Sequence, residues 1–145
     1  MKPIILLLLA TLTHDFSGTW EFNPAKSQNI GMMAQMKLIS TVKQTKRELI
    51  ITDVSTFNGR EQTNETRFDL TGKPVSNKNP MEAAAETVTK WDGDHLVTTW
   101  TSPGSIAGVT SVRTETRSLS ADGKTMTVES SRHKGPAMVM VYDRK

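Results

Sequence analysis

The chain has 145 residues, of which 23% are charged and 6% aromatic, and its formal net charge is +3 at pH 7. This length suits one domain and leaves no room for a second. The absence of cysteine excludes disulfides, thiol nucleophiles and thiol-linked lipid anchors. Basic residues alternate with acidic ones, as in residues 113–117, so the clustered positive stripe of nucleic-acid-binding proteins is absent. We expect these charges to form a solvated strand face.

The chain begins with one lysine and a compact apolar run that ends near Leu12. The run is too short to span a bilayer and has the form of a secretory signal peptide. We therefore expect residues 1–14 to be removed and residues 15–145 to form the mature domain. A buried first strand is the alternative. Removal of the segment predicts a secreted or periplasmic protein that keeps no stable membrane anchor.

After this run, Thr, Val, Ile and Trp are concentrated in segments that turn signals separate. β-Branched side chains favour strands, and Asn58-Gly59 is a strong two-residue hairpin signal. Tight turns make successive strands antiparallel. Eight to ten strands in this length predict an all-β, up-and-down barrel, with a two-sheet sandwich as the alternative. The expected strands are 18–23, 37–45, 48–57, 60–70, 84–91, 94–102, 108–119, 125–133 and 137–143, with a short additional strand near 74–78.

One segment after the first strand breaks the strand pattern. Pro24 with polar neighbours predicts a short helix or lid. Met32, Met33 and Met36 follow it and form a flexible apolar patch where a barrel mouth is expected. This patch either contacts a ligand as a lid or simply packs a short helix on the end of the barrel.

Several motifs resemble those of small secreted bacterial proteins with a lipocalin-like, calycin-type barrel. They are Gly18-Thr19-Trp20 with its preceding residues, and the segments 23–27, 90–96 and 119–125. The resemblance implies a lipocalin-like barrel. In the wider lipocalin superfamily the Trp of Gly-x-Trp closes one barrel end under an Arg from a late strand. The resemblance implies this role for Trp20, with Arg144 or Arg117 as the cation–π partner.

Aromatic and hydroxyl side chains share strand faces in a way that suits a small-ligand site. A two-residue turn at Asp92-Gly93 places Trp91 on one face with Thr98 and Trp100, whereas a three-residue turn moves Trp91 into the loop. Trp20 and Phe22 share the apolar face of the first strand, as either barrel core or ligand contact. The candidate ligand-binding residues are therefore Trp20, Phe22, Met33, Met36, Trp91, Thr98 and Trp100.

A second strand face offers soft metal ligands. If Gly135-Pro136 is a two-residue turn, His133 lies opposite Met138 and diagonal to Met140. One imidazole and two thioethers suit Cu(I). The string 135–140 also resembles the Pro-x-Met-x-Met strand of small periplasmic copper carriers. Ordinary core packing of the two methionines is the alternative.

Enzyme motifs are missing from the sequence, which contains no Gly-x-Ser-x-Gly, phosphate loop or His-Glu-x-x-His. We therefore predict no catalytic residue and no cofactor. The sequence predicts an exported, non-catalytic protein, monomeric or dimeric, that holds a small, largely apolar ligand inside a barrel and binds no nucleic acid. The alternatives are a periplasmic Cu(I) carrier and a protein-interaction module with a filled barrel.

Overall fold

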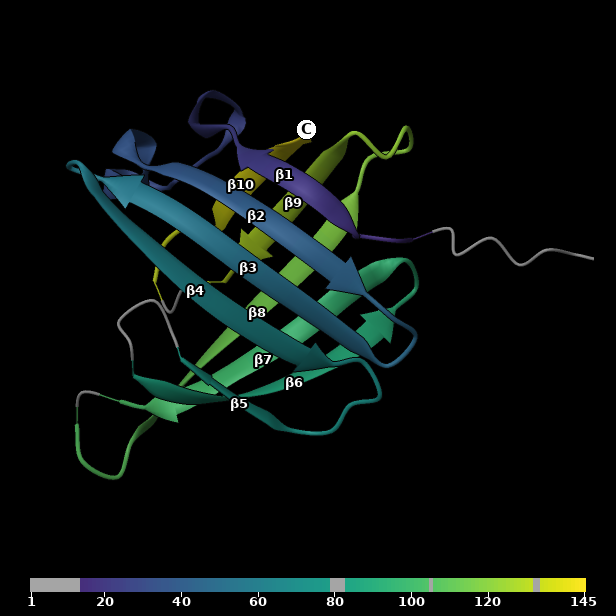
Figure 1. Ribbon diagram of the computed structural model, residues 1–145. Coiled ribbons are helices and arrows are strands. Elements are labelled where there is room, and N and C mark those ends of the chain that lie inside the picture. The colour runs from purple at the N-terminus through teal and green to yellow at the C-terminus, as the bar shows by residue number, and fades with distance from the viewer. Residues whose placement is uncertain (1–13, 79–82, 105, 132–133) are drawn as a thin grey trace, which may run out of the picture.

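A computed structural model describes residues 14–78, 83–104, 106–131 and 134–145, so the expected signal peptide lies almost entirely outside the described residues. Ten antiparallel strands form one sheet that curls into a nearly closed barrel (Figure 1). The predicted all-β, up-and-down barrel is confirmed, including the short additional strand. The strands are β1 (Gly18–Phe22), β2 (Lys37–Gln44), β3 (Glu48–Phe57), β4 (Arg60–Asp69), β5 (Val75–Lys78), β6 (Ala84–Asp92), β7 (His95–Pro103), β8 (Thr110–Leu119), β9 (Thr125–Ser130) and β10 (Met138–Arg144).

The order of the strands follows the chain with one exception. The sheet runs β4-β3-β2-β1-β10-β9-β8-β7-β6-β5, so the first and last strands are neighbours and the other neighbours are consecutive in the chain. Trp20 of β1 pairs with Ser40 of β2 on one side and with Arg144 of β10 on the other. The first and last strands therefore lie side by side in the barrel wall. The two edges of the sheet are β4 and β5, and the gap between these two strands is the seam of the barrel.

The side chain of Asn77 bridges this seam. Asn77 Oδ1 accepts a hydrogen bond from the backbone N–H of Arg67 at 3.1 Å, and Asn77 Nδ2 donates to the Arg67 carbonyl at 2.8 Å. The same Nδ2 donates to Thr87 Oγ1 at 2.9 Å. Within the described ranges β4 and β5 share no backbone ladder. The side-chain amide of Asn77 on β5 thus bonds the backbone N–H and carbonyl of Arg67 on β4, as the backbone of a paired strand would.

Replacement of Asn77 by alanine is expected to lower the free energy of unfolding by about 1 kcal/mol, because the seam loses its bridging hydrogen bonds and water replaces them. Urea denaturation of the two proteins measures this difference. The control is Ser76→Ala, since Ser76 is the exposed neighbour of Asn77 on β5. Equal stability of the two variants would contradict a structural role for the amide.

Two short 3-10 helices connect β1 to β2, where a short helix or lid was expected. They are η1 (Pro24–Lys26) and η2 (Gly31–Gln35). The Asn23 side chain caps η1 by accepting from the Lys26 N–H at 3.3 Å. Met33 packs against the core, while Met32 is 76% exposed. In the described part of the chain no helix is long and apolar enough to cross a membrane.

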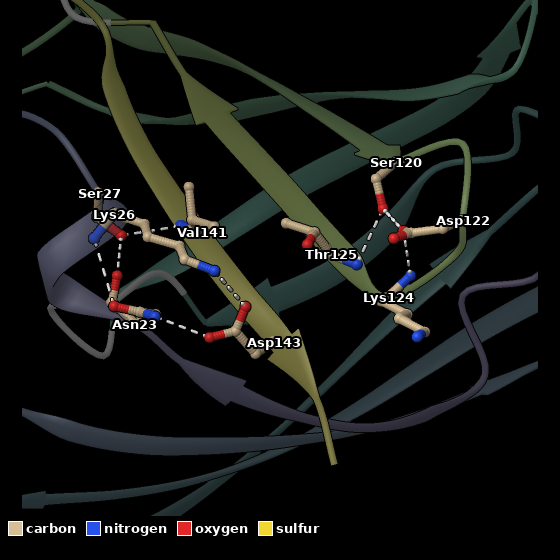
Figure 2. Close-up of polar contacts among 9 residues, drawn as sticks. All are labelled: Asn23, Lys26, Ser27, Ser120, Asp122, Lys124, Thr125, Val141 and Asp143. Carbon is tan, nitrogen blue, oxygen red and sulfur yellow. Dashed lines mark hydrogen bonds and ion pairs between the residues drawn. The ribbon is translucent and has the colours of Figure 1, made fainter.

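The segment after β1 is fastened to β10 by a polar clamp (Figure 2). Asp143 accepts from Asn23 Nδ2 at 2.7 Å and lies 3.2 Å from Lys26 Nζ. The Asn23 hydrogen bond, followed by that of Lys26, lowers the pKa of the Asp143 carboxyl. Ser27 Oγ accepts from the Val141 N–H at 2.9 Å. The motif in residues 23–27 therefore holds η1 against the last strand.

The last motif of the resemblance, residues 119–125, closes the turn between β8 and β9 (Figure 2). Ser120 Oγ donates to Asp122 Oδ1 at 2.6 Å, and the same carboxylate accepts from the Lys124 N–H at 3.0 Å. Ser120 Oγ also accepts from the Thr125 N–H at 3.0 Å. Residues 23–27 and residues 119–125 thus each stabilise one connection between strands. The candidate ligand-binding residues lie in neither motif.

Candidate functional site

The interior of the barrel is lined by alternate residues of the strands, because successive side chains point to opposite faces. Residues that pair across antiparallel strands share a face. The interior is not uniformly apolar, since hydroxyl groups and one guanidinium are buried with the aromatic and aliphatic core. The buried polar residues are Ser40, Thr66, Thr87, Thr89, Thr98, Arg117 and Ser130.

Trp20 closes one end of the barrel. Its side chain is fully buried, and its indole Nε1 donates to the carbonyl of Phe16 at 2.9 Å. The guanidinium carbon of Arg144 lies 4.2 Å from the centroid of the Trp20 ring. Arg144 is itself held by hydrogen bonds of 2.9 Å to the carbonyls of Ser17 and Gly123. Of the two arginines left open by the sequence, Arg144 is therefore the partner of Trp20.

Trp91 lies at the same end and is 39% exposed. Its ring stacks on Phe16 with 6.2 Å between centroids. Asp92 pairs with His95, which leaves a two-residue turn between β6 and β7. Trp91 therefore keeps the same strand face as Thr98, as the two-residue alternative predicted, but at the strand end where solvent reaches the ring.

The other candidate ligand-binding residues lie in the barrel or at its far end. Phe22 packs on Tyr142 at 5.6 Å between centroids, and Thr98 shares a 2.8 Å hydrogen bond with Thr89. Trp100 is 7% exposed on β7. Met33 belongs to η2 and Met36 follows it, at the opposite end of β1 from Trp20 and Trp91. The structure thus brings Phe22, Thr98 and Trp100 into the interior and places the others at its two ends.

Charged residues of β8 also face inward. Arg117 pairs with Leu96 and Glu115 with Thr98, so both share the face of buried β7 side chains. Arg117 is 8% exposed, with one nitrogen 3.4 Å from Met126 Sδ and another 3.4 Å from Glu115 Oε1. The prediction of a solvated face for residues 113–117 is therefore wrong for Arg117. The error arises because the outward residues of this stretch, Thr114 and Thr116, are also polar, so alternation does not distinguish the two faces.

A carboxylate on β3 faces the same interior. Ser40 Oγ donates to Asp53, which pairs with it across β2 and β3. Burial raises the pKa of the Asp53 carboxyl, while the Ser40 hydrogen bond and the charge of Arg117 act against the rise. Burial, with the Asp53 charge, also raises the pKa of Tyr142, so its phenol stays neutral. Four strands thus contribute one internal polar cluster, defined as Ser40, Asp53, Glu115, Arg117 and Tyr142.

A hollow of about 380 Å³ opens beside the seam between β4 and β5. Its rim carries the ion pair between Arg67 and Glu48, with 2.5 Å between nitrogen and oxygen. Phe68 and Val75 contribute apolar surface. Phe68 also meets Trp100 edge-on at 5.7 Å between ring centroids. The hollow therefore borders the core at Phe68, whose side chain is itself 2% exposed.

The proposed copper face differs from its prediction. His133 lies outside the described residues. Met138 pairs with Ser130, so the register predicted from a two-residue turn at Gly135-Pro136 is wrong. Met140 is buried in the core and Met138 packs against it. Among the residues that the structure describes, no group of three His, Cys, Asp or Glu side chains is arranged to hold a metal ion.

The fold, a nearly closed barrel of ten antiparallel strands, is similar to that of lipocalin-like and fatty-acid-binding-protein-like barrels. No family model and no curated protein matches the sequence. The fold is similar to "Human cRBP IV" (18% identity, 90% of this chain and 98% of that chain, TM-score 0.67). It is also similar to the "REP1-NXSQ fatty acid transporter" (16%, 89% and 95%, TM-score 0.70) and to fatty-acid-binding protein 1 of Echinococcus granulosus (16%, 89% and 96%, TM-score 0.68). At these identities the likeness shows the fold.

Proposed function

We propose that this protein holds a small, largely apolar ligand inside its barrel and does not transform it. Two of the similar structures are described as a fatty acid transporter and a fatty-acid-binding protein, which supports a ligand of that kind. Aromatic and aliphatic residues of the interior supply the apolar contact. Burial of apolar ligand surface contributes roughly 25 cal/mol per Å².

The observation that carries the proposal is the buried Arg117 with unused donor capacity. A guanidinium has five N–H donors, and the two contacts of Arg117 at 3.4 Å are long for charge-assisted hydrogen bonds. The neutral phenol of Tyr142 belongs to the same polar cluster. This cluster supports a ligand with one acidic or polar end, whose apolar remainder lies among the aromatic residues.

Export is part of the same proposal. It rests on the apolar run of residues 1–14, which has the form of a signal peptide. We expect the protein isolated from the periplasm or the medium of its host to begin near Asp15. N-terminal sequencing tests this, and an intact Met1 on protein recovered from the cell interior would contradict it.

Binding is tested by titrating the purified mature chain with long-chain fatty acids and the matched fatty alcohols, using calorimetry and tryptophan fluorescence. We expect saturable binding of one molecule per barrel and a preference for the acid. In the double variant Glu115→Gln/Arg117→Met the preference for the acid is expected to disappear, while Glu115→Gln alone retains it. No saturable binding of any acid or alcohol would contradict the proposed function.

A further inference from the structure

The indole N–H of Trp100 is buried without a hydrogen-bond partner. The side chain is 7% exposed, and no described residue accepts from Nε1. Buried indole N–H groups normally have an acceptor, and a buried donor without one costs stability. The fully buried Trp20, in contrast, donates to the Phe16 carbonyl. The described part of the protein therefore leaves the Trp100 donor free for an acceptor from outside.

The cross-strand neighbours of Trp100 do not supply that acceptor. On one side Trp100 pairs with Arg113, whose guanidinium carbon lies 4.9 Å from the centroid of the indole ring. On the other side it pairs with Thr87, whose hydroxyl already donates to the Val75 carbonyl and accepts from Asn77, both at 2.9 Å. The unpartnered N–H therefore lies beside a positive charge, where a negatively charged acceptor is favoured.

Arg113 is the less compensated of the two inward-facing arginines of β8. The carboxylate of Glu115 is shared between them, with one oxygen 3.4 Å from Arg117 and the other 3.8 Å from Arg113. Both distances are long for charge-assisted hydrogen bonds. Arg117 is also compensated by the charge of Asp53, whereas within the described ranges Arg113 makes its ion pair with Glu115 alone. A further negative charge is therefore needed most at Arg113.

One carboxylate is large enough to serve all of these donors. Because the single carboxylate of Glu115 contacts both arginines, the two guanidinium groups lie close together, and another carboxylate of the same size can face both. The guanidinium of Arg113 lies over the face of the Trp100 ring, whereas the indole N–H points outward in the plane of the ring. The guanidinium therefore does not block the N–H, and one carboxylate can accept from both groups.

We propose that the ligand is bound as a carboxylate anion whose oxygens accept from Trp100 Nε1 and Arg113, beside the ion pair of Glu115 with Arg117. This inference rests on the proposed function and names the groups that hold the acidic end of its ligand. The indole N–H makes Trp100 a residue that determines specificity, because a buried donor without an acceptor penalises a ligand that lacks one. Phe68, edge-on to the same ring, provides apolar contact next to the acidic end.

The test measures the binding of hexadecanoic acid and hexadecan-1-ol to the purified mature chain by calorimetry. Trp100→Phe keeps a ring beneath Arg113 and against Phe68 and loses the indole N–H. We expect this variant to bind the acid about tenfold more weakly than wild type, the effect of one hydrogen bond to a charged group. The alcohol is expected to lose less than about threefold, because its hydroxyl is neutral. Thr99→Val, on the outward face of β7, is the matched control and is expected to bind both molecules as wild type does.

Arg113 is tested separately from Trp100. Arg113→Met is expected to weaken binding of the acid about tenfold and to leave binding of the alcohol within about twofold of wild type. Arg113→Lys keeps the positive charge and is expected to restore part of the loss.

A measurement on wild type stands beside the variants, in case Trp100→Phe folds poorly. The indole N–H resonance of Trp100 is expected to move downfield when hexadecanoic acid binds, since the N–H then gains an acceptor. An unmoved resonance, or acid binding by Trp100→Phe within about twofold of wild type, overturns the inference and leaves the proposed function intact. Failure of wild type to bind either molecule overturns both.

Discussion

Replacement of Trp20 by alanine is expected to lower the free energy of unfolding by about 3–5 kcal/mol, the cost of removing a large buried aromatic side chain. The Trp20 indole is fully buried and covers one end of the barrel. Its loss also removes the hydrogen bond to the Phe16 carbonyl and the ring on which Arg144 lies. Denaturation in urea, followed by circular dichroism, measures the difference.

Trp20→Phe serves as the control, because it keeps a ring beneath Arg144 while losing the indole N–H and part of the buried area. We expect it to retain more than half of the stability lost in the alanine variant. A loss below about 1 kcal/mol for Trp20→Ala would mean that the end of the barrel is closed by other residues, since so small a cost is typical of surface positions.

Replacement of Arg117 by leucine is expected to lower the free energy of unfolding at pH 7 by about 3 kcal/mol. Removing one partner of a buried ion pair leaves its counter-charge unpaired in the interior. We expect a loss of unfolding free energy at the low end for such changes, because the positive charge of Arg113 remains 3.8 Å from Glu115. Denaturation curves from pH 4 to pH 8 measure the cost and its pH dependence.

The pH dependence has a definite sign. Burial already raises the folded-state pKa of Asp53 above its ordinary value, and Arg117 counteracts this rise. Between the unfolded and folded pKa values the folded protein binds more protons, so stability falls as pH rises through that window. Loss of Arg117 raises the folded-state pKa of Asp53 further, so this pH window extends upward. The loss of unfolding free energy in Arg117→Leu is therefore expected to be smaller in acid than at pH 7. The control Glu115→Gln/Arg117→Leu is expected to recover part of the loss at pH 7, whereas a deficit independent of pH would contradict this explanation.

Most of the fold was predictable because its signals are local. Asn58-Gly59 forms the β3–β4 turn at positive φ, as the hairpin signal indicates. Pro24 begins η1, and the β-branched segments form the strands. Even the role of Trp20 as an end closure followed from the resemblance, although the choice of Arg144 required the pairing of β1 with β10.

The internal polar cluster was not predictable in the same way, since its members come from distant parts of the chain. Asp53 follows an apolar run and reads as an ordinary strand residue. Its contact with Ser40 depends on the register of β2 and β3, and the charge of Arg117 reaches it only because the sheet is closed. Asn77 is a similar case, because a polar residue on a short strand reads as solvent-exposed until β4 is placed beside it.

The pairing of β1 with β10 has a consequence for the order of folding. β1 is the first strand of the chain, yet one of its two hydrogen-bonded neighbours is formed by residues 138–144. Such distant pairings slow folding and prolong the exposure of unpaired strand edges. The sheet therefore stays incomplete until residues 138–144 are in place, and a product truncated before Met138 leaves both β1 and β9 open to pairing with other chains.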